Sequence, residues 1–224
     1  MTTRIDFDSR NGDPIHGDLA EPAGTGKVPA VIVIQEWWGV NDHIRSLVDR
    51  FAAAGFLALA PDLYRGKTTK DGSEAMKLLE ALDWKVAVDD VGGALAQLEK
   101  HPRCNGKVGI TGFCMGGAVA LASGAQIPSL AAVVPFYGIP DASTDFSGLQ
   151  APVLGHFAKR DQHIPPAAAE ALEKRLKSAG KTVDIELYDA DHAFVNDTRP
   201  EVYNPEQAKL AWDRTIAFLH KQLG

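Results

Sequence analysis

Short runs of consecutive apolar residues recur along the chain, and segments with a helical spacing of apolar positions lie between them. Short apolar runs of this kind are typical of strands covered on both faces. The expected strands cover residues 28–35, 56–60, 107–111, 130–136, 152–157 and 182–188. The expected helices cover residues 43–54, 73–81, 83–101, 115–122, 166–179 and 205–222. Because alternating strands and helices form βαβ units, we expect an α/β fold with a mostly parallel central sheet and helices on both faces.

The start of the chain departs from this pattern. Residues 4–7 and 15–20 alternate apolar and polar positions around an Asn-Gly-Asp-Pro turn, which predicts an N-terminal antiparallel hairpin at a sheet edge. Asp42 directly precedes the first expected helix and is its candidate N-cap. Residues 137–150 are expected to form a loop with room for one helical turn. No large cap domain fits there, which indicates an open cleft and a small substrate.

Length, charge and cysteine content exclude several classes of protein. The chain has 224 residues, enough for one sizeable core, so we expect a single domain over residues 1–224. A net charge of −6 without a clustered basic stripe argues against a nucleic-acid partner. No apolar run could span a membrane, and the polar start lacks the apolar core of a signal peptide. The two cysteines, Cys104 and Cys114, lack a metal-ligand pattern, and a cytoplasmic, reducing setting fits best.

The chain is organised around the segment Gly-Phe-Cys-Met-Gly-Gly at residues 112–117, between an expected strand and an expected helix. This is a Gly-x-Cys-x-Gly form of the nucleophile elbow, in which glycines allow a sharp strand-to-helix turn. Cys114 would then stand at a helix N-terminus, where the helix dipole favours a thiolate. The backbone N–H of Met115 would point to where an oxyanion forms. The alternative is a glycine-rich turn with a buried, inert cysteine.

Three residues have the order of an α/β-hydrolase catalytic triad: Cys114, Asp161 and His192. Each follows an expected strand, and ligands of parallel sheets bind at the carboxyl ends of strands. A histidine would take the thiol proton, and a carboxylate would fix and stabilise the imidazole. Asp189 and Asp191 compete with Asp161, but the orienting carboxylate usually comes from another loop, which favours Asp161.

Glu36 ends the first expected parallel strand, beside an aromatic pair. It is either a solvated surface residue or a buried carboxylate with a raised pKa that exchanges a proton with Cys114. The N–H of Trp37 is a candidate second oxyanion donor, because that loop supplies one in this fold. Some aromatic residues could line an apolar pocket or belong to the core. They are Trp37, Trp38, Tyr64 and Phe113.

Five motifs, which follow one another along almost the whole chain, resemble the dienelactone hydrolase (carboxymethylenebutenolidase-like) family. They are Gln35-Glu36-Trp37-Trp38-Gly39, Pro61-Asp62-Leu63-Tyr64, Gly112-Phe113-Cys114-Met115-Gly116-Gly117, Arg160-Asp161 and Asp191-His192-Ala193-Phe194. The resemblance implies an α/β-hydrolase fold and hydrolysis of a small lactone or carboxylic ester without metal or cofactor. It also implies a Cys114–His192–Asp161 triad that forms an acyl-cysteine. In this family Glu36 would pair with the resting thiol and help to ionise it.

Two positions bear on the substrate. Arg65 is similar in place to a family arginine near the substrate carboxylate. Members that act on dienelactone carry a second arginine where this chain has Asn196, and an amide cannot replace the charge of a guanidinium. We therefore expect lower selectivity for anionic lactones if Asn196 faces the pocket. The alternative is that Asn196 only bonds local backbone.

The sequence thus predicts a cytoplasmic, monomeric hydrolase whose partner is a small lactone or ester, with no nucleic acid and no membrane. A non-catalytic α/β-hydrolase module that binds a small molecule or a protein is one alternative, although every triad member is present. A relative that processes thioesters or carbon–carbon bonds is another, because fold does not fix function.

Overall fold

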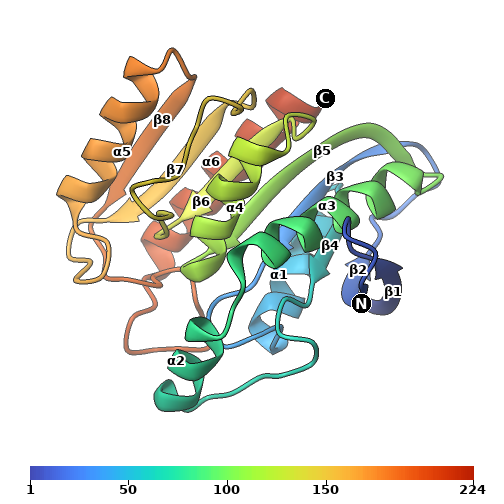
Figure 1. Ribbon diagram of the computed structural model, residues 1–224, viewed down its shortest axis with the longest axis horizontal. Helices are drawn as coiled ribbons and strands as arrows, with labels where there is room; N and C mark the ends of the chain where they lie inside the picture. The colour runs from blue at the N-terminus through green and yellow to red at the C-terminus, as the bar shows by residue number, and fades with distance from the viewer.

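The computed structural model describes all residues from Met1 to Gly224 and contains one eight-stranded sheet (Figure 1). The strands are β1 (Thr3–Asp8), β2 (Pro14–Ala20), β3 (Val28–Ile34), β4 (Leu57–Pro61), β5 (Cys104–Phe113), β6 (Ala132–Phe136), β7 (Val153–Ala158) and β8 (Val183–Tyr188). Their order across the sheet is β1-β2-β4-β3-β5-β6-β7-β8. The hairpin strands β1 and β2 are antiparallel, and β2 is antiparallel to β4, whereas the remaining pairs are parallel. The structure thus confirms the mostly parallel sheet and its N-terminal hairpin.

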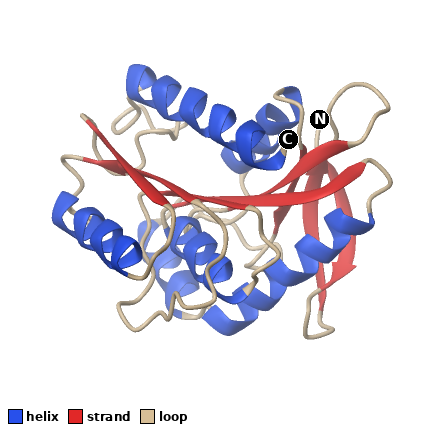
Figure 2. Cartoon of the chain, turned by 90° about the horizontal axis from the view of Figure 1, so that it is seen from above, coloured by secondary structure: helices blue, strands red, loops and turns tan.

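Helices cover both faces of the sheet, as Figure 2 shows. They are α1 (Asp42–Ala53), α2 (Gly72–Glu80), α3 (Trp84–Lys100), α4 (Met115–Gln126), α5 (Pro166–Ser178) and α6 (Pro205–Leu223). Buried residues of α1 and α6 share one apolar core, and those of α3, α4 and α5 share the core on the other face. Helix α2 buries only Ala75 and lies off the sheet at one end (Figure 1). No helix is long and apolar enough to cross a bilayer.

Three local details differ from the sequence interpretation. The N-cap of α1 is Asn41, whose side-chain oxygen accepts from the N–H of Ile44 at 3.2 Å, and Asp42 instead occupies the first turn. Strand β5 begins at Cys104, which pairs with Val28 before an irregularity in the register. The segment 137–150 contains no helical turn. It turns through Asp141 and Asp145, which each accept from a backbone N–H two residues on.

The parallel strands direct their carboxyl ends to the same side of the molecule. Glu36 follows β3, Cys114 follows β5, Tyr137 follows β6, Asp161 follows β7 and His192 follows β8. Because ligands of open α/β sheets bind outside these strand ends, this side is where a site is expected.

Candidate active site

Cys114 lies at a strained turn between β5 and α4. Its φ of 56° and ψ of −118° are unusual for a residue with a side chain. Glycines make the turn possible, because a Cβ at Gly112 would collide with the backbone of Gly116, and one at Gly116 would collide with the backbone of Gln35. Likewise, a Cβ at Gly138 would collide with the Cys114 carbonyl. Backbone packed against backbone therefore holds the partly exposed thiol in one place.

His192 and Asp161 form a hydrogen-bonded pair beside this turn. Nδ1 of His192 lies 2.7 Å from Oδ2 of Asp161, whose side chain is fully buried. The other oxygen of Asp161 accepts from the N–H groups of His163 and Ile164, at 2.8 and 2.9 Å. Burial alone would raise the pKa of Asp161, but the hydrogen bonds from His192 and Ile164 hold it below its usual range. The carboxylate is therefore charged and fixed in orientation.

The environment of His192 favours its protonated form. Burial lowers the pKa of the imidazole, but hydrogen bonds to Asp161 and Cys114 outweigh burial and raise the pKa to about 10. Cys114 and His192 line the same cleft. The competing aspartates, Asp189 and Asp191, form ion pairs with Arg160 at the surface instead.

Glu36 is buried, with 1 % of its surface exposed. Nδ2 of Asn196 donates to Oε2 of Glu36 at 2.7 Å, and Oε1 has no hydrogen-bond partner. Burial raises the pKa of Glu36, although His43, Asn196 and His192 each oppose the shift. A carboxylate in this state can accept a proton near neutral pH more readily than a solvated one.

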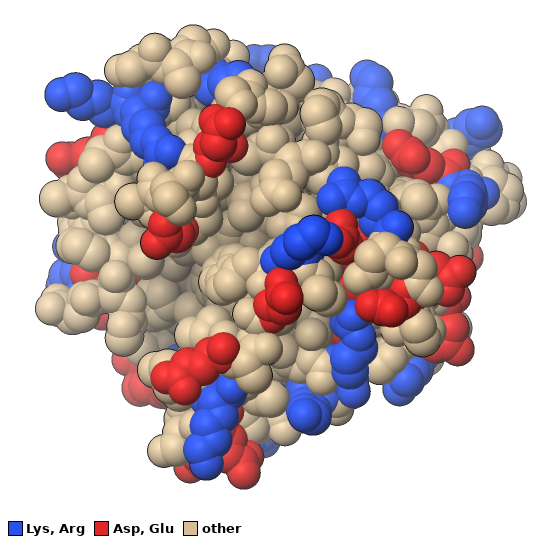
Figure 3. Space-filling view, viewed as in Figure 1, with Lys and Arg blue, Asp and Glu red and all other residues tan.

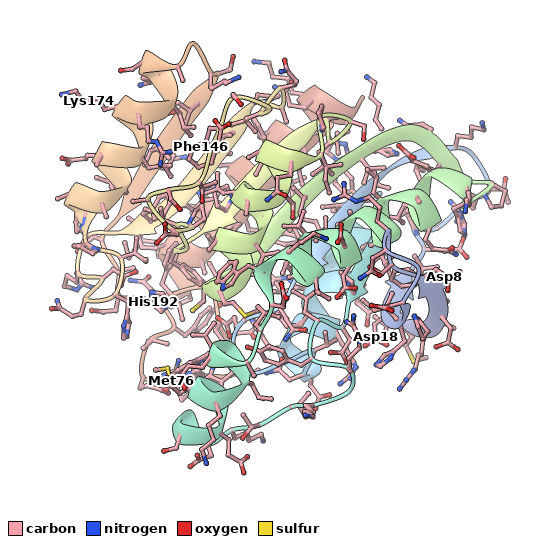
Figure 4. All side chains as sticks on the ribbon, in the orientation of Figure 1. Asp8, Asp18, Met76, Phe146, Lys174 and His192 are labelled. Atoms are coloured by element: carbon pink, nitrogen blue, oxygen red, sulfur yellow. The ribbon has the colours of Figure 1, made fainter.

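An apolar cleft of about 420 Å³ opens over Cys114 and His192. We call it the apolar cleft; its apolar walls include Trp37, Trp38, Met76, Leu79, Trp84 and Ile139. Figure 4 shows His192 and Met76 at the same end of the molecule, where α2 stands beside the loop after β8. The hollowed part of this face carries few charged side chains, which stand mainly around it (Figure 3). Arg199 is the one arginine or lysine in the lining.

The two candidate oxyanion donors lie at this cleft. Met115 is the first residue of α4, so its N–H has no partner within the helix. Met115 and Trp37 both line the apolar cleft next to Cys114. Tyr64 does not line it; its hydroxyl donates to the Met115 sulfur at 3.2 Å and supports that residue from behind.

Phe113 and Arg65 were expected to contact the substrate, but both lie away from the apolar cleft. Phe113 is buried in the core shared with α1 and α6, where it stacks on Phe136 with ring centroids 4.7 Å apart. Its neighbour Cys114 faces the cleft, and successive side chains of a strand point to opposite faces. Arg65 makes two hydrogen bonds, of 2.7 and 2.9 Å, to the buried Asp90 on α3, so its guanidinium ties a loop to a helix. Neither residue lines the apolar cleft.

The side chain of Asn196 is also engaged in hydrogen bonds within the protein. Besides donating to Glu36, it accepts from the N–H of Thr198 at 3.1 Å. It lines a separate cleft of about 460 Å³, which we call the polar cleft. The lining of the polar cleft includes Trp38, His43, Lys70, Asn196, Thr198 and Arg199. Trp38 and Arg199 line both clefts, and the Arg199 guanidinium lies 5.6 Å from the Trp38 ring.

Sequence reasoning missed Tyr137. It is fully buried with a φ of 38°, and its ring centroid lies 5.1 Å from that of His192. Burial, then the charges of Glu36 and Cys114, raise the pKa of its hydroxyl well above the usual value. The phenol therefore stays neutral between the cleft and Glu36. The signal that could have found it is its place directly after strand β6, as for the other site residues.

Comparisons with known proteins identify the family of the chain. The model of the "Dienelactone hydrolase family" matches residues 15–223. The chain is 34 % identical to "Protein usf" of Aquifex pyrophilus and 32 % identical to a "Putative carboxymethylenebutenolidase" of Aquifex aeolicus, in both cases over 100 % of each chain. A crystal structure described as a "Putative Dienelactone Hydrolase" from Klebsiella pneumoniae superposes with a TM-score of 0.85 at 33 % identity. That match covers 96 % of this chain and 98 % of the other.

Proposed function

Because the chain belongs to the dienelactone hydrolase family and is thus a carboxylic ester or lactone hydrolase, we propose that Cys114 is its nucleophile and becomes acylated during turnover. One observation carries this proposal: Cys114 is held at a strained elbow beside His192, which a buried Asp161 fixes at 2.7 Å. A nucleophile next to a base that a third group orients is the arrangement that covalent hydrolysis needs.

In the proposed acylation, the Cys114 thiol gives its proton to the Glu36 carboxylate. The thiolate attacks the carbonyl carbon of the substrate, and the C=O electrons move to the oxygen. The N–H groups of Met115 and Trp37 stabilise this oxyanion. When the tetrahedral intermediate collapses, the leaving alkoxide takes a proton from His192. The raised pKa of His192 supports this step, because the imidazole is protonated before the attack.

In the proposed deacylation, the now neutral His192 takes a proton from water. The resulting hydroxide attacks the acyl carbon, and the Cys114 thiolate leaves as the acid product forms. Asp161 holds the imidazole in orientation and stabilises its cationic form in both half-reactions. Glu36 then returns its proton to the thiolate, which restores the resting enzyme.

The lining of the apolar cleft supports a small substrate with an apolar acyl group or ring. Trp37, Trp38 and Trp84 offer flat apolar surface, and Arg199 offers one cation. Since Asn196 is bound to Glu36 and Arg65 to Asp90, neither is free to hold a substrate carboxylate. We propose that neutral esters and lactones are accepted at least as well as anionic ones.

We also propose that the chain acts as a single-domain monomer in the cytoplasm, without metal or cofactor. The single matching family model over residues 15–223 supports one domain, and the unpaired Cys104 and Cys114 support a reducing compartment.

The test is a screen of neutral lactones, aryl esters and thioesters with wild type beside Cys114→Ala, followed by alkylation with iodoacetamide. Mass spectrometry should locate the label on Cys114, and activity should fall in proportion to labelling. The buried Cys104 serves as the internal control. Activity that persists in Cys114→Ala, or that is lost when only Cys104 is labelled, would rule out this nucleophile.

A further inference from the structure

A third cleft, of about 610 Å³, adjoins the apolar cleft. We call it the distal cleft; it is formed by the start of α3, the end of α4 and the loop after β6. Its apolar surface comes from Trp84, Val88, Ala122, Ile139 and Pro140. Trp84 and Ile139 also line the apolar cleft, so the two clefts share a wall. No residue of the proposed triad lines the distal cleft, which therefore offers binding surface rather than chemistry.

The shared wall is fixed relative to the proposed nucleophile. Gly138 packs so closely on the elbow that a Cβ there would lie 1.9 Å from the carbonyl oxygen of Cys114. Ile139, the next residue in the chain, forms one part of the wall. Trp84 forms the other part from the first position of α3, a helix that begins there because the side chain of Asp83 caps it. Backbone packing and a helix cap thus hold the wall beside the thiol.

The two sides of the apolar cleft suit different parts of an ester. His192 reaches the cleft from the loop after β8, at the edge of the sheet, whereas Trp84 reaches it from α3, which packs over β3, β4 and β5. In the proposed acylation His192 gives a proton to the leaving alkoxide, so the alcohol part of the ester lies beside His192. The acyl group therefore extends the other way, toward Trp84 and the distal cleft.

Exposed apolar side chains gather at this place. Four large apolar residues of the chain are exposed, and two of them, Met76 and Trp84, line the apolar cleft. The exposed fraction of Trp84 is 41 %, although its ring is among the largest apolar surfaces a residue can offer. Exposed apolar surface in a concave site marks a place where a ligand binds. A hydrocarbon chain that crosses the wall would remove the Trp84 ring from water.

The polar rim of the distal cleft disfavours an anionic chain end. Asp141 and Asp145 line this cleft, and hydrogen bonds from the serines two residues on hold the pKa of both carboxyls below the usual range. Lys85 is the one lysine or arginine in the lining, and its ammonium pairs with Asp89 at 2.9 Å. A terminal carboxylate would therefore meet like charges, whereas an uncharged hydrocarbon fits the apolar surface.

We propose that the distal cleft is an acyl-chain subsite, which takes the end of an uncharged, medium-length acyl group whose first carbons occupy the apolar cleft. This inference rests on the proposed function, in which Cys114 accepts the acyl group. It names the substrate class as neutral esters whose hydrocarbon acyl chain crosses the wall of Trp84 and Ile139. The far end of the chain binds equally in the ground and transition states, so it lowers KM and leaves the reacting bonds unaffected.

The experiment measures kcat and KM for p-nitrophenyl acetate and p-nitrophenyl octanoate, which share a leaving group, in wild type and Gln126→Trp. Gln126 ends α4, is exposed, and lines the distal cleft but not the apolar cleft, so an indole there fills the distal cleft without entering the core. Each methylene that leaves water gains about fourfold in affinity. Wild type should prefer octanoate. Gln126→Trp, by excluding about two methylenes, should lower the octanoate-to-acetate ratio of kcat/KM about 15-fold, mainly through KM.

Gln150→Trp is the matched control, because it makes the same substitution at an exposed position that lines neither cleft. Its ratio should equal that of wild type. A wild type that prefers acetate, or equal ratios in Gln126→Trp and Gln150→Trp, would overturn the subsite. If Gln126→Trp does not fold, Thr144→Trp, on the loop that faces α4 across the distal cleft, decides the outcome. Failure of the proposed function would appear separately, as hydrolysis of both esters that persists in Cys114→Ala.

Discussion

His156 is fully buried and His192 is partly exposed, and the structure gives them opposite acid–base behaviour. Nδ1 of His156 lies 2.7 Å from the Tyr188 hydroxyl, and Nε2 lies 2.9 Å from the Thr215 hydroxyl. Burial, with a contribution from Arg214, lowers the pKa of His156 to about 3. Burial also acts on His192, but Asp161 and Cys114 raise its pKa to about 10. The charge of the partners, rather than burial, decides whether a histidine in this protein carries a proton.

Position in the fold explains which partners each histidine meets. His156 lies within β7, and its side chain faces α6, where it meets the hydroxyl groups of Thr215 and Tyr188. His192 lies after β8, where the loops that end parallel strands meet. His156, inside a strand, is therefore a neutral core residue, and His192, beyond a strand end, is available for proton transfer.

The largest effect is expected when the charge of Asp161, which raises the pKa of His192, is removed. Asp161→Asn should lower kcat by about 10⁴-fold, as loss of a triad carboxylate does elsewhere, because the imidazole loses its orientation and its stabilised cation. Steady-state kinetics with an aryl ester provide the measurement. Asp191→Asn is the matched control, since Asp191 pairs with Arg160 at the surface. Equal losses in the two variants would refute the assignment of Asp161.

A core substitution tests the other histidine. His156→Phe leaves the hydroxyls of Tyr188 and Thr215 without their imidazole partner, which should lower the free energy of unfolding by about 1–3 kcal/mol. Urea denaturation measures this loss. In the folded variant kcat/KM should remain at the wild-type level, because His156 touches neither cleft. A selective loss of kcat would show that His156 also serves the reaction.

The two histidines should make the free energy of unfolding change with pH in opposite directions. Both have a reference pKa of 6.5. Between pH 6.5 and about 3 the unfolded chain binds a proton that folded His156 refuses, so stability falls as the pH falls. Between pH 6.5 and about 10 folded His192 keeps a proton that the unfolded chain releases, so stability falls as the pH rises.

Each histidine changes the free energy of unfolding by at most about 1.4 kcal/mol per pH unit, because one proton is involved. Free energies of unfolding measured from pH 4 to 9 in His156→Gln should lose part of the acid slope and keep the alkaline slope. His192→Gln should show the reverse. If both variants keep the wild-type slopes, the contrast between the two histidines does not hold.

The smallest expected effect concerns the charge next to His156. Arg214 donates to Tyr188 and pairs with Glu186, and its charge disfavours protonation of His156. Arg214→Met should raise the pKa of the folded His156 imidazole by a few tenths of a pH unit, because a partly screened positive charge is removed. NMR titration of the His156 ring protons gives the value. Lys209→Met, on the same helix with an exposed partner, is the control.

The parallel sheet, the elbow and the residues after its strands could be predicted because their signals are local. Apolar runs mark the strands, glycine spacing marks the turn at Cys114, and topology then gathers the strand ends. Contacts between distant segments leave no such signal. The pairing of Arg65 with Asp90, and of His43 with Asp197, depends on how separate elements pack. The inward direction of Phe113 follows from strand alternation, because its neighbour Cys114 points to the cleft.

Helix α2 buries a single residue, Ala75, yet supplies Met76 and Leu79 to the wall of the apolar cleft. Leu78 and Leu79 also pack against the apolar core, whereas Met76 is exposed. A substitution of Met76 should therefore change the shape offered to a substrate with little effect on folding. A library confined to residues 72–80 is accordingly a short route to new substrate preferences.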